Sequence, residues 1–136
     1  MIRFEDWPVR LSAFLEASID KPFVWGECDC MIFCADAILE MTGLDKAYDV
    51  RGTYDTKEEA DEIIAVYGEN VEALLDDRLG ERKSVKFCHR GDIVTYDYQG
   101  TICAGVVDDT GKRAAFMTET GLTRIPLKLC RTAWTV

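Results

Sequence analysis

The stretch that decides the fold is Pro22–Met41, which reads PFVWGECDCMIFCADAILEM. Its second half, from Cys30 onward, carries only two charged residues, Asp36 and Glu40. A helix built from this half would be apolar on almost every side, and such a helix must be buried inside the protein. We therefore expect one central helix, around which the rest of the chain packs.

The ends of this helix are marked by the residues on either side of it. Gly26 interrupts the chain before the helix, and Asp29 is a residue type that often caps a helix N-terminus. Gly43 stands where the helix would end, because glycine readily adopts the left-handed conformation that closes a helix. Within these limits, Cys30 becomes the first residue of the helix.

The position of Cys30 suggests chemistry. A thiol at a helix N-terminus faces free backbone N–H groups and the positive end of the helix dipole, and both lower its pKa. Cys30 is therefore a candidate nucleophile. The alternative is that Cys28, Cys30 and Cys34 are simply small apolar side chains of the core, where free cysteine is common.

The composition limits the possible classes of protein. A chain of 136 residues, 48% apolar and 30% charged, has the size and composition of one globular domain. The N-terminal residues MIRFEDWPVR lack the apolar segment of a signal peptide, so we expect synthesis in the cytoplasm and no membrane insertion. The net charge of −9 argues against binding to nucleic acid, which normally requires a basic face.

The six cysteines are expected to be reduced, because no secretion signal precedes them. Their spacing contains no CxxC pair of the kind that binds zinc or iron–sulfur clusters. We therefore expect no metal and no cofactor, and a thiol-based metal or iron–sulfur protein stays open as an alternative.

Three amphipathic helices are expected besides the central one. The first follows Asp6 and has Pro8 in its first turn. The second follows Thr56, which forms a capping-box pattern with Glu59, and the third follows Asn70. Their expected buried stripes are Trp7, Leu11, Phe14, Leu15 and Ile19, then Ala60, Ile63, Ile64 and Tyr67, then Val71, Leu74, Leu75 and Leu79.

The C-terminal part has the pattern of strands rather than of helices. Four β-rich runs, 93–96, 102–107, 113–118 and 122–127, are separated by short turn sequences that contain glycine. Short turns between successive strands indicate an antiparallel meander. The sequence therefore predicts a single α+β domain over 1–136, with a helical part at about 4–80 and a sheet part at about 91–136 packed on the buried helix.

Four short motifs stand at the expected helix start and on the first two expected strands: Trp25-Gly26, Asp29-Cys30, Gly91-Asp92-Ile93-Val94 and Cys103-Ala104-Gly105-Val106. They resemble the motifs of the NlpC-type papain-like cell-wall peptidases. In that family Trp-Gly and Asp-Cys precede the buried helix, Gly-Asp-apolar-apolar opens a strand, and His-apolar-Gly-apolar follows on the next strand. The resemblance implies a papain-like fold with Cys30 as the nucleophile and with Cys103 in place of the catalytic histidine, facing Cys30 across a cleft.

A second set of motifs runs nearly from end to end of the chain: Pro22–Gly26 with Asp29-Cys30, Arg51–Tyr54, Gly91–Val94, Gly121-Leu122 and Ala133-Trp134. In these motifs the chain resembles a group of short phage and prophage proteins that are related to these peptidases and are encoded among tail genes. This resemblance implies a component of a phage tail tip or baseplate, with other tail proteins as partners. Such a protein would be in the host cytoplasm during assembly and then in the virion tail.

A papain-type reaction needs a thiol, a histidine that takes and returns its proton, and a third polar group that orients the ring. Cys103 stands where that histidine is expected, and His89, the only histidine, is not aimed at Cys30 by the pattern. Asp29 and Asp92 are expected to cap a helix and a turn. The favoured hypothesis is therefore a papain-like domain without amidase activity that serves phage tail structure or assembly; the alternative is an active peptidoglycan amidase or endopeptidase that uses Cys30.

Overall fold

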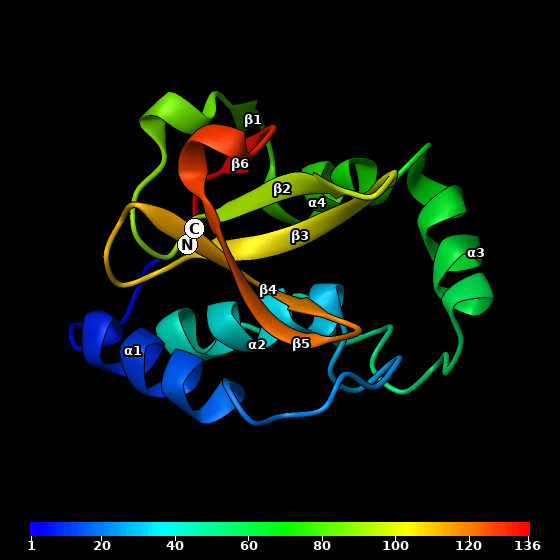
Figure 1. Ribbon diagram of the computed structural model, residues 1–136, viewed down its shortest axis with the longest axis horizontal. Coiled ribbons are helices and arrows are strands. Elements are labelled where there is room, and N and C mark those ends of the chain that lie inside the picture. Colours follow the sequence, from blue (N-terminus) through cyan, green and yellow to red (C-terminus); the bar gives the residue numbers. More distant parts are fainter.

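The chain folds into four α-helices and one sheet in a computed structural model that describes residues 1–136 (Figure 1). The helices are α1 (Trp7–Ser18), α2 (Cys30–Thr42), α3 (Lys57–Tyr67) and α4 (Val71–Leu79). The strands are β1 (Arg82–Lys83), β2 (Ile93–Tyr98), β3 (Thr101–Val107), β4 (Arg113–Thr118), β5 (Gly121–Pro126) and β6 (Ala133–Trp134). Two short 3-10 helices, η1 (Val85–Phe87) and η2 (Leu127–Leu129), follow β1 and β5. The prediction of an α+β fold with an antiparallel sheet is confirmed.

Helix α2 begins and ends where the sequence predicts. The carboxylate of Asp29 accepts a hydrogen bond from the backbone N–H of Ile32 at 2.9 Å and so caps the N-terminus. Gly43 closes the other end in the left-handed conformation, and its N–H donates to the carbonyl of Leu39. The buried residues of the helix are Ile32, Phe33, Cys34, Ala35, Ala37, Ile38, Met41 and Thr42.

The sheet has the strand order β1-β6-β2-β3-β4-β5, and all neighbouring strands are antiparallel. Strands β2 to β5 follow one another both in the chain and in the sheet. Helix α2 lies between α1 and the sheet, where it packs mainly on β3 and also on β4 (Figure 1). The main core forms between α1, α2, α4 and this face, and Val94, Val107 and Phe116 belong to a smaller cluster on the opposite face.

Strands β1 and β6 were not expected from the sequence. Each has two residues, and they pair with each other through Arg82–Trp134 and Lys83–Ala133, while β6 also pairs with β2. The sheet therefore includes a segment that lies before residue 91, the limit predicted for the sheet part. Strands this short contain no alternation of apolar and polar residues, so their pairing is decided by contacts distant in sequence.

Helix α1 departs from its prediction at both ends. The side chain of Asp6 makes no capping hydrogen bond and instead accepts one from Arg10 Nε at 2.8 Å. Ile19 lies just beyond the helix and is 55% exposed rather than part of the buried stripe. Leu11 and Leu15 are fully enclosed, so the centre of the stripe holds the helix on the core.

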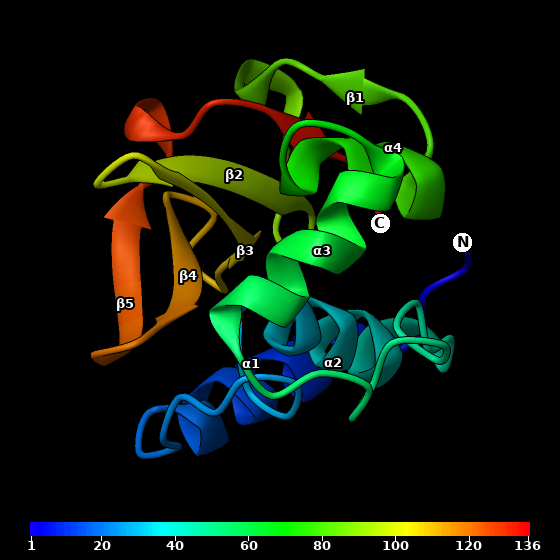
Figure 2. The ribbon, with the colours of Figure 1, turned by 90° about the vertical axis from the view of Figure 1, so that its right-hand side faces the viewer.

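Helix α3 has the predicted capping box but little of the predicted burial. The backbone N–H of Glu59 donates to Thr56 Oγ1 at 3.1 Å, and Glu59 accepts from the backbone N–H of Asp55. Among its residues only Ala60 is buried, while Ile63, Ile64 and Tyr67 are half-buried. The helix stands apart at one end of the molecule and packs mainly against α4 (Figures 1 and 2).

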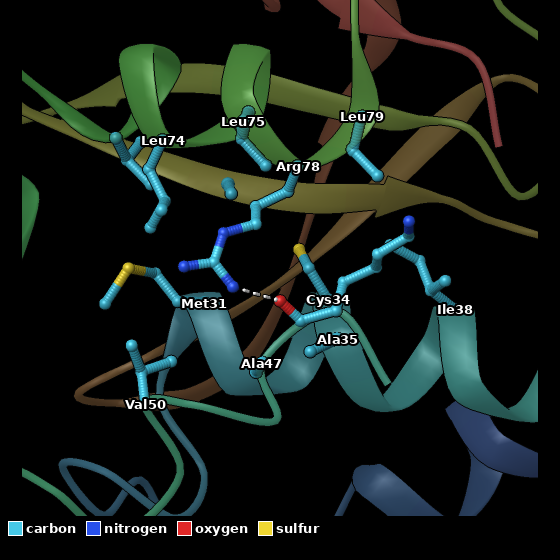
Figure 3. Close-up of a pocket in the computed structure, with 13 residues that line it drawn as sticks. Met31, Cys34, Ala35, Ile38, Ala47, Val50, Leu74, Leu75, Arg78 and Leu79 are labelled. Carbon is cyan, nitrogen blue, oxygen red and sulfur yellow. Dashed lines mark hydrogen bonds between the residues drawn. The ribbon is translucent and has the colours of Figure 1, made fainter. Parts of the chain in front are cut away.

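A narrow apolar cavity of about 40 Å³ lies between α2 and α4, with Cys34 and Leu75 among its walls (Figure 3). Arg78 closes it by donating to the carbonyl oxygen of Lys46 at 3.0 Å, to the carboxylate of Asp49 and to the hydroxyl of Tyr67. The cavity has room for about one water molecule, so we assign it to the packing of the core rather than to a binding site. Arg78 joins α4 to α3 and to the connector after α2.

The predicted turn residue Asp92 joins distant parts of the chain. Its buried carboxylate accepts hydrogen bonds from the backbone N–H groups of His89 and Val136 and pairs with Arg3 and Lys83. The guanidinium of Arg3 also donates to the carbonyl oxygen of Val136 at 2.9 Å. The two ends of the described chain are thereby held side by side on Asp92 (Figure 1).

Candidate functional site

The thiol of Cys30 is positioned by a hydrogen-bond network on Asp29. The Asp29 carboxylate is fully buried and accepts the backbone N–H groups of Gly26 and Ile32, each at 2.9 Å. The hydroxyl of Tyr54 donates to the same carboxylate. Gly26 has a φ of 83°, and a Cβ atom there would overlap the carbonyl oxygen of Tyr54. The glycine turn, the helix start and Tyr54 therefore form one fixed unit beneath Cys30.

The role of Tyr54 is not predicted by the sequence. Its contact with Asp29 joins residues 25 positions apart, and no local pattern signals such a contact. Burial raises the pKa of Tyr54, so its hydroxyl stays protonated and remains a donor to Asp29. The capping role predicted for Asp29 is confirmed and extends to a side chain from the connector after α2.

Cys103 lies on β3 where this strand separates from β4. The register pairs β3 with β4 only at Val106–Ala115 and Val107–Ala114, so the beginning of β3 has no partner on that side. The backbone N–H of Ala104 faces the sulfur of Cys30 there and favours its ionised form. The thiols of Cys30 and Cys103 lie within interaction range of each other and line the same cleft. The structure thus brings together the two residues that the resemblance paired.

The electrostatics of the pair differ from the expectation for Cys30. The interaction with Cys103, together with burial, places the pKa of Cys30 well above its usual range. Together these two causes outweigh the Ala104 N–H, which lowers the pKa of Cys30. The expectation that the helix N-terminus would lower this pKa is therefore wrong. The same interaction with Cys30 lowers the pKa of Cys103, although burial opposes it. Cys103 is therefore the first of the two thiols to ionise.

Both thiols open on a cleft with a volume of about 340 Å³. Its walls come from the Phe23–Trp25 segment, from the start of α2, from α3, and from the β2–β3 and β4–β5 turns. Lys57, Asp61 and Glu119 place charges around an otherwise largely apolar lining. The cleft can therefore accept a small or extended ligand that carries both apolar and charged groups.

His89 does not take part in this cleft. Its side chain is exposed and lies in a different surface depression, together with Arg3, Trp7 and Arg90. Since His89 is the only histidine of the chain, no imidazole lines the cleft beside Cys30. The prediction that His89 is not aimed at Cys30 agrees with this placement.

Gly105 lies two residues after Cys103 on β3 and makes a close contact with β4. A Cβ atom on Gly105 would lie 2.5 Å from the ring of Phe116. Gly105 therefore makes room for Phe116 on the opposite face of the sheet. It is Ala104, on the other face of β3, that packs in the main core with α2.

Two further observations concern metal binding and membrane crossing. No group of three or more histidine, cysteine, aspartate or glutamate side chains is arranged to hold a metal ion. None of the helices has the length and apolar character needed to cross a membrane.

The chain forms an α+β domain with one antiparallel sheet and a cleft at the start of its central helix. The structure is similar to the crystal structure of the NlpC/p60 domain of the peptidoglycan hydrolase SagA, with a TM-score of 0.59. The similarity covers 95% of this chain and 98% of the other, at 16% sequence identity. At this identity the likeness concerns the fold.

The chain belongs to the family DUF6950, a domain of unknown function, whose family model matches residues 2–136. No curated protein matches the sequence.

Proposed function

We propose that this protein is a catalytically silent papain-like domain that serves as a structural or assembly component of a phage tail tip or baseplate. The observation that carries the first half of this proposal is that Cys30 and Cys103 lie together in a cleft without histidine. A cysteine occupies the position at which an amidase would hold its general base.

Two steps of peptide hydrolysis lack the ionisable groups that they require in this arrangement. The attacking sulfur must be a thiolate, but the raised pKa of Cys30 keeps this thiol protonated near neutral pH. The leaving amine must then receive a proton from a group that titrates near pH 7. Once ionised, Cys103 would be a second nucleophile rather than a proton shuttle.

The tail assignment is supported by the sequence resemblance, whose pieces run from Pro22 to Trp134. The net charge of −9 suits partners with basic patches, because complementary charge guides encounter and orientation. The proposed partners are other tail or baseplate proteins, and the proposed location is the host cytoplasm during assembly and then the virion tail.

The catalytic half of the proposal is tested by incubating the purified protein with peptidoglycan stem peptides and following cleavage by mass spectrometry. We expect no cleavage above that of the Cys30→Ala variant, with an active NlpC/p60 domain as the positive control. Cleavage that depends on Cys30 would overturn the proposal and identify the protein as a cysteine peptidase.

The structural half is tested on purified phage particles. Peptide mass spectrometry should find the protein in intact virions at a constant ratio to the known tail proteins. Its absence from particles produced by cells that express it would exclude a role in the finished tail.

A further inference from the structure

The cleft contains two neighbouring reduced thiols and no histidine that would use them in catalysis. Cys30 and Cys103 come from different elements, line the same open space and are close enough to shift each other's pKa. Asp29 is occupied in capping α2 and in binding Tyr54. A pair of neighbouring thiols that small molecules can reach has one characteristic reaction, which is exchange with a disulfide.

We propose that Cys30 and Cys103 form a reversible disulfide through exchange with small disulfides that enter the cleft. Cys103 attacks the incoming disulfide as a thiolate, which forms a mixed disulfide on Cys103 and releases one thiolate. Cys30 then loses its proton to solvent and attacks the sulfur of Cys103, which releases the second thiolate. The two cysteines are oxidised by two electrons, and the small disulfide is reduced to two thiols.

The order of these steps follows from the environment of each sulfur. The interaction with Cys30 lowers the pKa of Cys103, and the nearby Lys57 acts in the same direction. The pKa of Cys30 is raised, so this thiol remains protonated until a mixed disulfide stands beside it. Cys103 is therefore the attacking thiol and Cys30 the resolving thiol.

The local structure permits the small movement that a bond requires. A disulfide needs sulfur atoms about 2.05 Å apart and Cα atoms within roughly 7 Å. The two thiols line the same cleft and are close enough to shift each other's pKa, so side-chain rotation and a slight approach of the strand would complete the geometry. The beginning of β3 has no partner on the side of β4, and it can shift without breaking a strand pair there.

Cys88 and Cys130 provide an internal control. They pack in the same cluster on the opposite face of the sheet and are close enough to influence each other. Burial raises the pKa of both, and that of Cys130 rises to about 11. Neither thiol is activated, so this pair should react with small disulfides much more slowly than Cys103.

The test uses the reduced full chain and oxidised glutathione at pH 7.5, with alkylation and peptide mass mapping after quenching. We expect a linkage between Cys30 and Cys103 to form at least tenfold faster than any reaction at Cys88 or Cys130. The Cys30→Ser variant should accumulate glutathione on Cys103, and Cys130→Ser should behave as the parent protein.

The product should also be more stable than the reduced protein. A bond between α2 and β3 closes a large loop, so we expect Tm to rise by about 5–15 °C on oxidation and to return on reduction with dithiothreitol. Pairing of Cys30 with Cys28, Cys34 or Cys88, or glutathione that accumulates on Cys30 of the parent protein, would overturn the proposal. So would unchanged thiols at Cys30 and Cys103 in a protein that circular dichroism shows to be folded.

Discussion

Helices α2 and α3 form walls of the same cleft, yet the rest of the protein holds them very differently. Helix α2 packs on α1 and on the sheet, and Asp29 caps it with a buried carboxylate. Helix α3 packs mainly against α4 and is capped by the exposed residues Thr56 and Glu59. Val66, near its end, is 81% exposed. One wall is part of the core, and the other is attached to its surface.

The difference shows what helix signals can and cannot specify. Both helices have N-caps that function as the sequence predicts. Burial depends instead on which surface remains uncovered when the chain folds, and α1, α2 and α4 already enclose the main core. Helix α3 therefore presents Ala60 and Ile64 to the cleft, and Ile64 packs only at the edge of the main core.

The largest effect is expected from a charge in the centre of α2. Ile38 is 2% exposed, and Ile38→Asp would place an unpaired carboxylate in the core. We expect this variant to lose soluble folding, judged by expression, circular dichroism and urea unfolding. Val66→Asp on α3 is the matched change and should alter the free energy of unfolding by less than about 0.5 kcal/mol. Equal effects of the two variants would contradict the comparison.

A smaller difference should separate the two N-caps. Asp29→Ala would leave the N–H groups of Gly26 and Ile32 and the hydroxyl of Tyr54 without their acceptor. We expect a loss of about 2–4 kcal/mol in urea unfolding, more than an ordinary cap contributes. Thr56→Ala removes an exposed cap from α3 and should cost about 1 kcal/mol or less. If both variants lose the same stability, the network on Asp29 is no stronger than a surface cap.

The smallest expected effect is a change of stability with pH. It arises from Glu72 on α4, the helix against which α3 packs. Burial opposes ionisation of Glu72 on α4, but hydrogen bonds from Arg131 and Thr95 outweigh it and lower its pKa. A lowered pKa stabilises the fold above about pH 4.3, the value of an unfolded glutamate, and this contribution disappears as pH falls further. Stability should therefore decline on acidification, with a shallower decline in Glu72→Gln.

Hydrogen exchange would identify the helix in which the loss of stability at low pH begins. As the pH falls, the protection of α3 amides should decrease before that of α2 amides, after correction for intrinsic exchange rates. Simultaneous loss of protection in both helices would mean that α3 belongs to the same cooperative unit as α2.

The parts of the fold that the sequence predicts best are those with local causes. The limits of α2 follow from Asp29 and Gly43, which act within a few residues of the helix. Strands β1 and β6 have two residues each and exist because distant segments meet, so no pattern marks them. The exposure of α3 has a similar origin, since amphipathicity does not identify the surface that a helix will cover.

The features of the site also divide into local ones, which the sequence predicts, and contacts across the fold, which it does not. The placement of Cys30 at the start of a helix follows from its neighbours, whereas its encounter with Cys103 was expected from the family resemblance alone. The expected sign of its pKa shift was wrong because the helix N-terminus is a local feature and Cys103 is not. The role of Tyr54 is not predicted by the sequence for the same reason, because it depends on a contact across the fold.

The cluster on Asp92 has a consequence for the topology of the polypeptide. Because Arg3 and Val136 are held on one carboxylate, a short linker could join the two ends without distorting either. New termini could then be opened at an exposed connection away from the cleft, such as Gly80-Glu81 between α4 and β1, far along the chain from both ends. A circular permutant of this kind should keep the cleft intact. The same closeness would let the whole domain be inserted into a surface loop of another protein with little separation of that loop's ends.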